Sequence, residues 1–243
     1  MSAQDLLMEL EPMLIILTGI PATGKTETRK ELMLMISNSF VLEKDLINQG
    51  ILHVIKDNNP KLLPFEEYVK GDDVFPNCIR QTKTSFGDMM RIDPKNAFYL
   101  RHGKFQTYLI MQKLAAENLN NGKVPIIDCF PISYLINGSL QIFMNHHFFD
   151  SYQKHLIHFT ADLDDLFLRY VERAKLDEEA ARRDIDKIGQ DPYKPDRDLF
   201  DRFVTEKQPP VPQELENYKY LLINTSRGTS KQCARQCLDY LLG

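Results

Sequence analysis

The sequence of residues 19–26 is Gly19-Ile20-Pro21-Ala22-Thr23-Gly24-Lys25-Thr26, and this stretch decides the fold. It matches the pattern G-x-x-x-x-G-K-[ST] at every fixed position. In such a stretch the glycines let backbone N–H groups close around phosphate oxygens, and the following helix adds the positive end of its dipole. Lys25 would reach the β- and γ-phosphates, and the Thr26 hydroxyl would ligate Mg²⁺. The stretch therefore predicts a binding loop for the phosphates of a nucleotide.

The stretches around this loop alternate between apolar runs and helix-like patterns. This alternation predicts an α/β fold with a mainly parallel sheet and helices on both faces. The run at 13–18, directly before the loop, is apolar up to Thr18, as expected for a strand buried on both faces. Strands are expected at 13–18, 39–43, 124–129, 155–160 and 220–225, and helices at 24–36, 46–56, 96–120, 162–188 and 231–242.

Length and composition limit the class of protein. The 243 residues suffice for one domain over 1–243. There are 34 acidic and 30 basic residues, and the net charge of −4 excludes a polybasic nucleic-acid coat. The longest apolar run, 13–17, is too short to span a bilayer, and the N-terminal residues lack the basic region of a signal peptide. Four cysteines without a CxxC spacing favour a reduced, cytoplasmic protein, and we expect no membrane partner.

One region departs from the alternation. Prolines interrupt residues 58–95 and no periodicity persists, so we expect an insertion or a segment that covers the substrate. Residues 80–104 contain six basic against two acidic residues, which suits an anionic substrate. Aromatic residues there could stack on a base or a sugar, although a solvated face above core aromatics gives the same pattern. The candidate substrate-binding residues are Arg80, Arg91, Arg101 and His102.

Acidic residues stand at two of the expected strand ends. Asp45 follows the strand at 39–43, and because ligands bind at the carboxyl ends of parallel strands, it is suited to be a general base. It could instead cap the helix that follows, and Glu43 is the second candidate base. Asp128 ends the apolar run of the strand at 124–129 and could hold Mg²⁺, or cap the strand end.

Histidine and cysteine pairs are weaker signals. His155 and His158 lie three positions apart in an expected strand and therefore point to opposite faces, so we do not expect them to share a metal ion. Cys233 and Cys237 share a face of an expected helix, but no second pair of ligands accompanies them. We expect them to be ordinary core or surface thiols.

Five features, in this order, resemble the P-loop kinases related to polynucleotide kinase, zeta toxins and small antibiotic phosphotransferases, within the broad AAA-type ATP-binding domain family. They are the glycine-rich loop, an acid after the second strand, an apolar strand that ends in Asp, an Arg-rich helical stretch and an Ile-Asn-Thr-Ser segment at 223–226. The resemblance covers 12–242 except 58–95. It implies a three-layer P-loop NTPase fold with a five-stranded sheet, a helical lid at 162–206, and ATP and Mg²⁺ as cofactors.

The resemblance also implies roles for individual residues. Asp45 would accept the proton of the acceptor hydroxyl, and Asp128 would be the Walker B acid that holds Mg²⁺ together with Thr26. Arg173 of the lid would stabilise the transferring phosphoryl group, as phosphoryl transfer requires. The family often has Arg three residues after the base, and this chain has Asn48 there. Beyond the loop, the nucleotide-binding candidates are Thr28, Arg169, Ser226 and Arg227, with Arg182 and Arg183 as further lid residues.

These features predict a P-loop phosphotransferase that moves the γ-phosphate of ATP to a hydroxyl of a small-molecule, nucleotide or nucleotide-sugar acceptor. Many P-loop ATPases carry Glu directly after the Walker B acid, whereas this chain has Cys129, which favours transfer over hydrolysis. An N-K-x-D element for guanine is absent, which argues against a GTPase. Two alternatives stay open. One is a polynucleotide 5′-hydroxyl kinase, favoured by the basic residues at 80–104, and the other is an ATP-binding switch without transfer.

Overall fold

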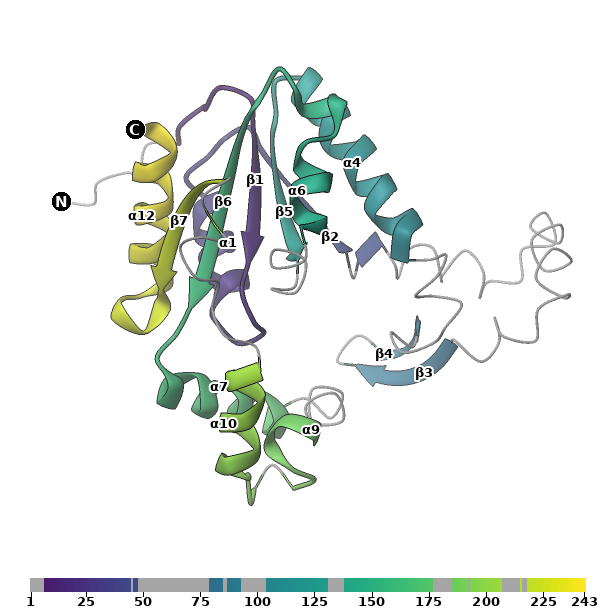
Figure 1. Cartoon of the computed structure of the whole chain (residues 1–243), viewed down its shortest axis with the longest axis vertical. Coiled ribbons are helices and arrows are strands. Elements are labelled where there is room, and N and C mark those ends of the chain that lie inside the picture. Colours follow the sequence, from purple (N-terminus) through teal and green to yellow (C-terminus); the bar gives the residue numbers. More distant parts are fainter. Residues whose placement is uncertain are drawn as a thin grey trace, which may run out of the picture.

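A five-stranded, all-parallel sheet forms the centre of the chain in the computed structural model (Figure 1). The structure describes residues 7–44, 46–47, 79–84, 87–92, 104–130, 138–176, 185–191, 193–206, 215 and 218–243. The strand order is β2-β5-β1-β6-β7, which confirms the predicted α/β class and the parallel sheet. The strands are β1 (Met13–Thr18), β2 (Ser39–Glu43), β5 (Val124–Phe130), β6 (Gln153–Thr160) and β7 (Lys219–Asn224).

β1 lies in the middle of the sheet, and each of its six residues is buried. Its apolar side chains alternate between two cores, so the unbroken apolar run reflects a strand covered on both faces. Ile15 and Leu17 belong to one core, whereas Leu14 and Ile16 belong to the other. The loop that follows β1 therefore leaves the sheet at its centre.

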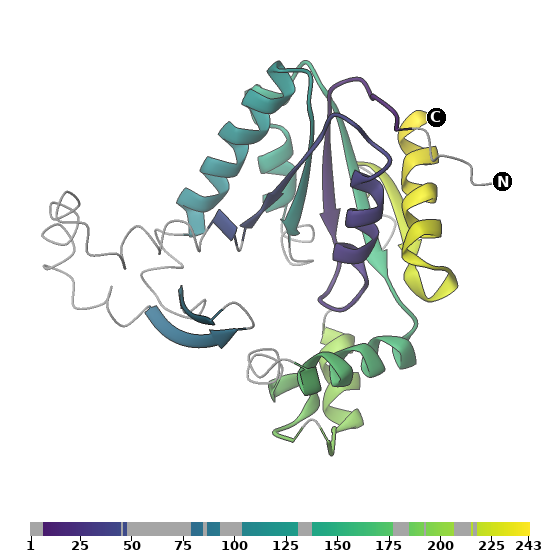
Figure 2. The same ribbon diagram turned by 180° about the vertical axis from the view of Figure 1, so that it is seen from behind.

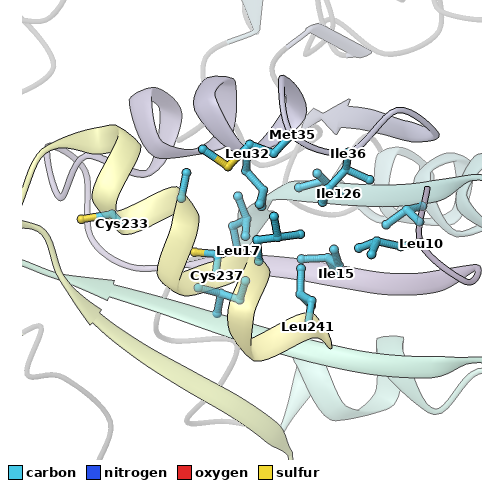
Figure 3. Packing of buried hydrophobic residues seen from close by; sticks show 14 of the residues in the cluster. Leu10, Ile15, Leu17, Leu32, Met35, Ile36, Ile126, Cys233, Cys237 and Leu241 are labelled. Atoms are coloured by element: carbon cyan, nitrogen blue, oxygen red, sulfur yellow. The ribbon is translucent and has the colours of Figure 1, made fainter. Parts of the chain in front are cut away.

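Helices cover the two faces of the sheet as separate layers (Figures 1 and 2). On one face lie α1 (Lys25–Met33) and α12 (Ser230–Leu242), which pack with the sheet around Leu32 and Leu238. Figure 3 shows this core, where α12 contributes the buried thiols of Cys233 and Cys237. On the other face lie α4 (Lys104–Asn120) and α6 (Ser139–Met144). The predicted three-layer arrangement is thus present.

A third group of helices lies at the carboxyl ends of the strands (Figure 1). These are α7 (Leu163–Leu176), α9 (Ile185–Ile188) and α10 (Arg197–Glu206), which we call the end helices. They have an apolar cluster of their own, centred on the fully buried Tyr170 and Phe200. Ile20 and Ala22 of the loop after β1 pack against that cluster.

Several expected boundaries differ from the structure. The helix expected at 24–36 is α1, which begins at Lys25 and ends at Met33. The continuous helix expected at 162–188 is represented by α7 and α9, with 177–184 outside the described residues. Most of the helix expected at 46–56 and the first part of the one at 96–120 also lie outside them.

Some elements were not predicted at all. Within 58–95 an antiparallel pair forms, β3 (Ile79–Thr84) and β4 (Gly87–Ile92). Its strands carry many charged and polar residues, which hide the apolar alternation by which strands are recognised. The helix α6 and the short helical turn His147–Phe149 were missed as well, whereas α10 lies within the helical region expected at 162–206. Within the described part of the chain, every helix is too short or too polar to cross a membrane.

A buried asparagine joins three segments at the amino ends of the strands. The side chain of Asn38 accepts a hydrogen bond from the Leu10 N–H (3.1 Å) and donates to the Leu10 carbonyl (2.7 Å). It also donates to the carbonyl of Gly122 (2.9 Å), in the turn after α4. One side chain therefore satisfies three backbone groups from two distant places in the sequence, as buried polar groups require.

We predict that Asn38→Ala lowers the free energy of unfolding by about 2–4 kcal/mol, because it removes three hydrogen bonds and leaves buried backbone groups unpaired. Urea denaturation followed by circular dichroism measures this loss. Asn118→Ala is the matched control, since among the described residues that side chain bonds to the Leu114 carbonyl alone, on an exposed helix face. Equal stabilities for the two variants would contradict the role of Asn38.

Candidate functional site

The loop after β1 turns from the sheet into α1 through glycines that no other residue can replace without strain. Gly19 has φ +136°, and a Cβ there would lie 2.4 Å from the carbonyl oxygen of Phe159 on β6. Gly24 has φ +77° and precedes the first residue of α1. Both fixed glycines of the motif are thus required by the backbone, and the loop lies at the N-terminus of α1, where anions bind.

Lys25 holds its ammonium group within this loop. Nζ donates hydrogen bonds to the carbonyl oxygens of Gly19 (2.9 Å) and Ile20 (3.1 Å). Burial lowers the pKa of Lys25, the neighbouring Asp128 carboxylate raises it, and Arg173 lowers it again. Asp128 and Arg173 therefore both lie close enough to Lys25 for their charges to act on its ammonium group. An ammonium has three N–H donors, so one more remains for an anion.

The loop backbone is further fixed by Thr23 and Ala22. The Thr23 hydroxyl donates to the carbonyl of Ile20 (2.8 Å), which closes the loop on itself. Ala22 has φ +66°, a left-handed conformation that costs a residue with a Cβ about 1–2 kcal/mol. Such strain persists only where the surroundings over-determine the conformation, as they often do at functional sites.

Thr225 and Arg169 connect this loop to the far edge of the sheet and to α7. Nη1 of Arg169 donates to the Thr225 hydroxyl (2.7 Å) and lies 3.5 Å from the Ala22 carbonyl, while Nη2 donates to the Thr225 carbonyl (3.3 Å). The Thr225 hydroxyl lies within donating distance of the carbonyls of Thr23 (3.0 Å) and Thr160 (3.2 Å). Arg169, a predicted nucleotide contact, therefore holds the loop from α7.

The segment after β7 is tied to the start of α7 as well. The Asn224 side chain donates to Asp162 (2.8 Å) and accepts from the N–H of Ser226 (3.0 Å), and the Asp162 N–H donates to the Ser226 hydroxyl (2.8 Å). These bonds form the turn Thr225–Arg227, in which Arg227 is exposed. The structure thus brings the Ile-Asn-Thr-Ser segment beside the glycine-rich loop, while the predicted nucleotide contacts of Ser226 and Arg227 stay predictions.

Asp128 and Glu43 stand side by side at the carboxyl ends of β5 and β2, where the register pairs them. Arg29 of α1 bridges them, with Nη2 2.8 Å from Glu43 Oε1 and Nη1 3.2 Å from Asp128 Oδ2. Sequence reasoning missed Arg29. A charged residue on the sheet-facing side of α1, four positions after Lys25, is the signal that could have found it.

Arg173 lies one helical turn beyond Arg169 on α7. Its guanidinium carbon is 4.7 Å from the centre of the Tyr170 ring, a cation–π contact. The charge of Arg173 is close enough to Lys25 to lower its pKa. The predicted lid arginine is thus near the loop, held against the apolar cluster of the end helices.

His158 occupies the end of β6 next to this site. Its Nδ1 is 2.6 Å from the Thr18 hydroxyl, and both residues are buried. Burial and, to a smaller extent, the charge of Lys25 lower the pKa of His158 to about 4. The imidazole is therefore neutral near pH 7. Among the described residues no three His, Cys, Asp or Glu side chains gather as a metal site.

Of the remaining predicted residues, the structure describes some and leaves others outside the described part of the chain. Thr26 is exposed at the first turn of α1, and Thr28 is buried on the same helix. Arg80 and Arg91 are register partners in the β3–β4 pair. Asp45, Asn48, Arg101, His102, Arg182 and Arg183 lie outside the described residues, so their roles stay predictions.

Comparisons with known proteins support the fold. No family model matches the chain, and no curated protein matches it in sequence. A solved structure from Chloroflexus aurantiacus, provisionally designated a kinase, has 18% identity and a TM-score of 0.51, and the match covers 96% of this chain and 97% of that one. At this identity the likeness concerns the fold alone, and it shows that this chain shares the α/β fold of that structure.

Two further solved structures are more distant. A gluconokinase from Sinorhizobium meliloti has 9% identity and a TM-score of 0.48, with 96% of this chain and 93% of that one covered. A tunicamycin resistance protein from Deinococcus radiodurans has 14% identity and a TM-score of 0.47, with 93% and 94% covered. At these TM-scores neither carries an argument about this chain.

We predict that Thr225→Val lowers the free energy of unfolding by about 1–3 kcal/mol, because it leaves an Arg169 N–H and the Thr23 carbonyl without their partner. Urea denaturation tests this. Thr205→Val is the matched control, since the Thr205 hydroxyl bonds to the Asp201 carbonyl of its own helix, on the exposed side of α10. If both variants lose the same stability, Thr225 does not join the loop to α7 in the way described.

Acidification should destabilise the protein through His158. Its folded pKa of about 4 lies below the unfolded value of 6.5, so the unfolded state binds more protons between these values and stability is lost as the pH falls. Between pH 7 and pH 5, His158→Gln should lose about 2 kcal/mol less than the parent protein. Urea titrations at both pH values measure this, with the exposed His147→Gln as control. An unchanged pH dependence in His158→Gln would show that His158 titrates normally.

Proposed function

We propose that this protein is an ATP-dependent kinase that transfers the γ-phosphate to a hydroxyl of a small-molecule, nucleotide or nucleotide-sugar acceptor. One observation carries the proposal: the glycine-constrained loop at the centre of the sheet holds Lys25, and Asp128 on the adjacent strand is close enough to raise its pKa. A kinase-like fold supports phosphoryl transfer as the reaction type. The acceptor is proposed from the sequence alone.

The loop and its neighbours are suited to hold a nucleotide. The backbone N–H groups of residues 19–26 and the N-terminus of α1 would bind the phosphate oxygens, and Lys25 would neutralise their charge. Ser226 and Arg227 directly follow Thr225, whose hydroxyl bonds to the Thr23 carbonyl of the loop, and they could contact the rest of the nucleotide. Arg169 would act mainly by holding the loop, since Thr225 and Ala22 already occupy its guanidinium.

The donor atoms present fit Mg²⁺. This ion prefers oxygen ligands and is commonly held by one or two carboxylates together with phosphates and water. Asp128 supplies a carboxylate on the strand beside β1, and the exposed Thr26, the last residue of the phosphate-binding motif, supplies a hydroxyl. Such a site does not need three or more protein ligands in one cluster, and the described His, Cys, Asp and Glu side chains form no cluster of that size. When bound, Mg²⁺ would offset the negative charge of the triphosphate.

Asp45 and Arg173 would complete the reaction. Asp45 comes two residues after Glu43 and would take the proton of the attacking hydroxyl. Arg173 would stabilise charge on the transferring group, since the end helices place it near Lys25. Within this proposal, residues 162–206 form the lid and residues 58–95 cover the acceptor. The net negative charge of the chain favours a small acceptor over a polynucleotide.

We predict that Lys25→Ala lowers γ-phosphate transfer by at least about 100-fold, because the group that neutralises phosphate charge is lost. Transfer from labelled ATP is measured against sugars, nucleosides, antibiotics, nucleotide-sugars and oligonucleotides. Lys30→Ala is the matched control, because Lys30 lies on α1 but pairs with Glu27 at the surface. Asp45→Asn should bind ATP and fail to transfer.

Other outcomes point to the alternatives. ATP binding without a labelled product for any acceptor would favour a regulatory switch. Labelled oligonucleotides, together with salt-sensitive binding of single strands, would favour a polynucleotide kinase. Full transfer by Asp45→Asn would show that another group, with Glu43 as the first candidate, takes the proton.

A further inference from the structure

Arg29 is a buried cation between two carboxylates that belong to different strands. Its side chain is 6% exposed, that of Asp128 is 10% exposed and that of Glu43 is 32% exposed. Nη2 is 2.8 Å from Glu43 and Nη1 is 3.2 Å from Asp128. The two terminal nitrogens thus serve two different partners, while Nε is buried without a hydrogen bond within the described part of the chain.

The sheet forces these carboxylates together. β2 and β5 are parallel neighbours whose register pairs Glu43 with Asp128, so both side chains project on the same face. That face is the one covered by α1, since Val41 and Ile126 belong to the core beneath α1. Two like charges at neighbouring register positions repel each other, and a cation between them removes the repulsion.

Arginine suits this position better than lysine does. Its planar guanidinium presents several N–H donors in a fixed arrangement and can therefore bridge two carboxylates at once. Burying such a charge costs free energy that only good pairing offsets, so the pairing restricts the position of all three groups. Arg29 also lies four residues after Lys25 on α1, so the helix that begins at the loop is joined directly to both strand ends.

We propose that Arg29 is a positioning residue of this site, which fixes Asp128 and the end of β2 relative to the phosphate-binding loop. The inference rests on the kinase function proposed above. Asp128 is the carboxylate that would hold Mg²⁺, and Glu43 is two residues before Asp45. Arg29 thereby sets both the metal side and the acceptor side of the site from one helix, without touching a substrate.

Two other roles for Arg29 make different predictions. A purely structural ion pair would affect stability and leave nucleotide binding in Mg²⁺ unchanged. A competing cation would occupy Asp128 at the expense of Mg²⁺, so its removal would strengthen Mg²⁺-dependent binding. Partners that orient metal ligands typically change metal affinity or activity by about 10–100-fold when they are lost.

The experiment measures how the affinity of the full chain for a fluorescent ATP analogue depends on Mg²⁺, for the parent protein, Arg29→Lys and Arg29→Met. In Arg29→Met, we expect the Mg²⁺ concentration for half-maximal binding to rise by about tenfold or more, with the metal-free affinity retained. For Arg29→Lys, this Mg²⁺ concentration should lie between those of the parent protein and Arg29→Met, because an ammonium keeps the charge but not the bridging geometry. Lys30→Met on the exposed side of α1 is the matched control.

Steady-state transfer gives a second readout. Arg29→Met should lower kcat more than it raises the KM for ATP, because the loop and Lys25 stay in place. The loss of transfer in the double variant Glu43→Gln/Arg29→Met, expressed as a free energy, should be smaller than the sum of the losses in the two single variants. Both substitutions break the same contact. Thermal denaturation of each variant reports folding, and if Arg29→Met does not fold, Arg29→Lys decides.

The outcomes separate this inference from the proposed function. If the Mg²⁺ concentration for half-maximal binding is unchanged or lower in a folded Arg29 variant, the positioning role is overturned, while the kinase proposal stands. If the parent protein shows no Mg²⁺-dependent binding of the ATP analogue, the proposed function fails and the positioning role fails with it.

Discussion

The close approach of Gly19 to β6 is the constraint on which the rest of the site depends. β1 is buried on both faces and lies between β5 and β6. The chain that follows it therefore emerges from the sheet at the carboxyl end of β1. There the backbone passes so near the Phe159 carbonyl that a Cβ would lie 2.4 Å away. Only glycine fits, and its φ of +136° directs the chain back toward α1. The position of the loop, and of Lys25 at its end, follows from this turn.

Two arginines on helices then hold the loop and the neighbouring strand ends from opposite sides. Arg169 on α7 bonds to Thr225 and so ties the loop to the β7 edge. Arg29 on α1 bonds to Glu43 and Asp128 and so ties the loop helix to the β2 edge. Because the hydrogen bonds of charged groups are stronger than neutral ones, these two contacts fix the site with few residues. Lys25 itself donates to the Gly19 and Ile20 carbonyls within the loop.

The sequence was enough to predict what depends on local pattern, and it failed where distant residues meet. Apolar runs predicted all five strands of the sheet, and the glycine-rich motif predicted the loop. Asn38 and Arg29 were not predicted, because the partners of each lie far away in sequence, such as Asp128 for Arg29. Residues 177–184, between α7 and α9, lie outside the described residues, so the continuity of the helix expected at 162–188 stays a prediction. The charged strand β3 shows no clear alternation.

The variable positions of the loop have a structural reason of their own. Ile20 and Ala22 pack against the apolar cluster of the end helices, although the motif leaves both positions open. Glycine in place of Ala22 would relieve the left-handed strain of about 1–2 kcal/mol, but it would remove the methyl group that meets this cluster. The loop therefore keeps its strained residue because packing and the Arg169 contact offset the strain. Loop and end helices cannot move independently, so a displacement of α7 alters the backbone that would bind phosphate.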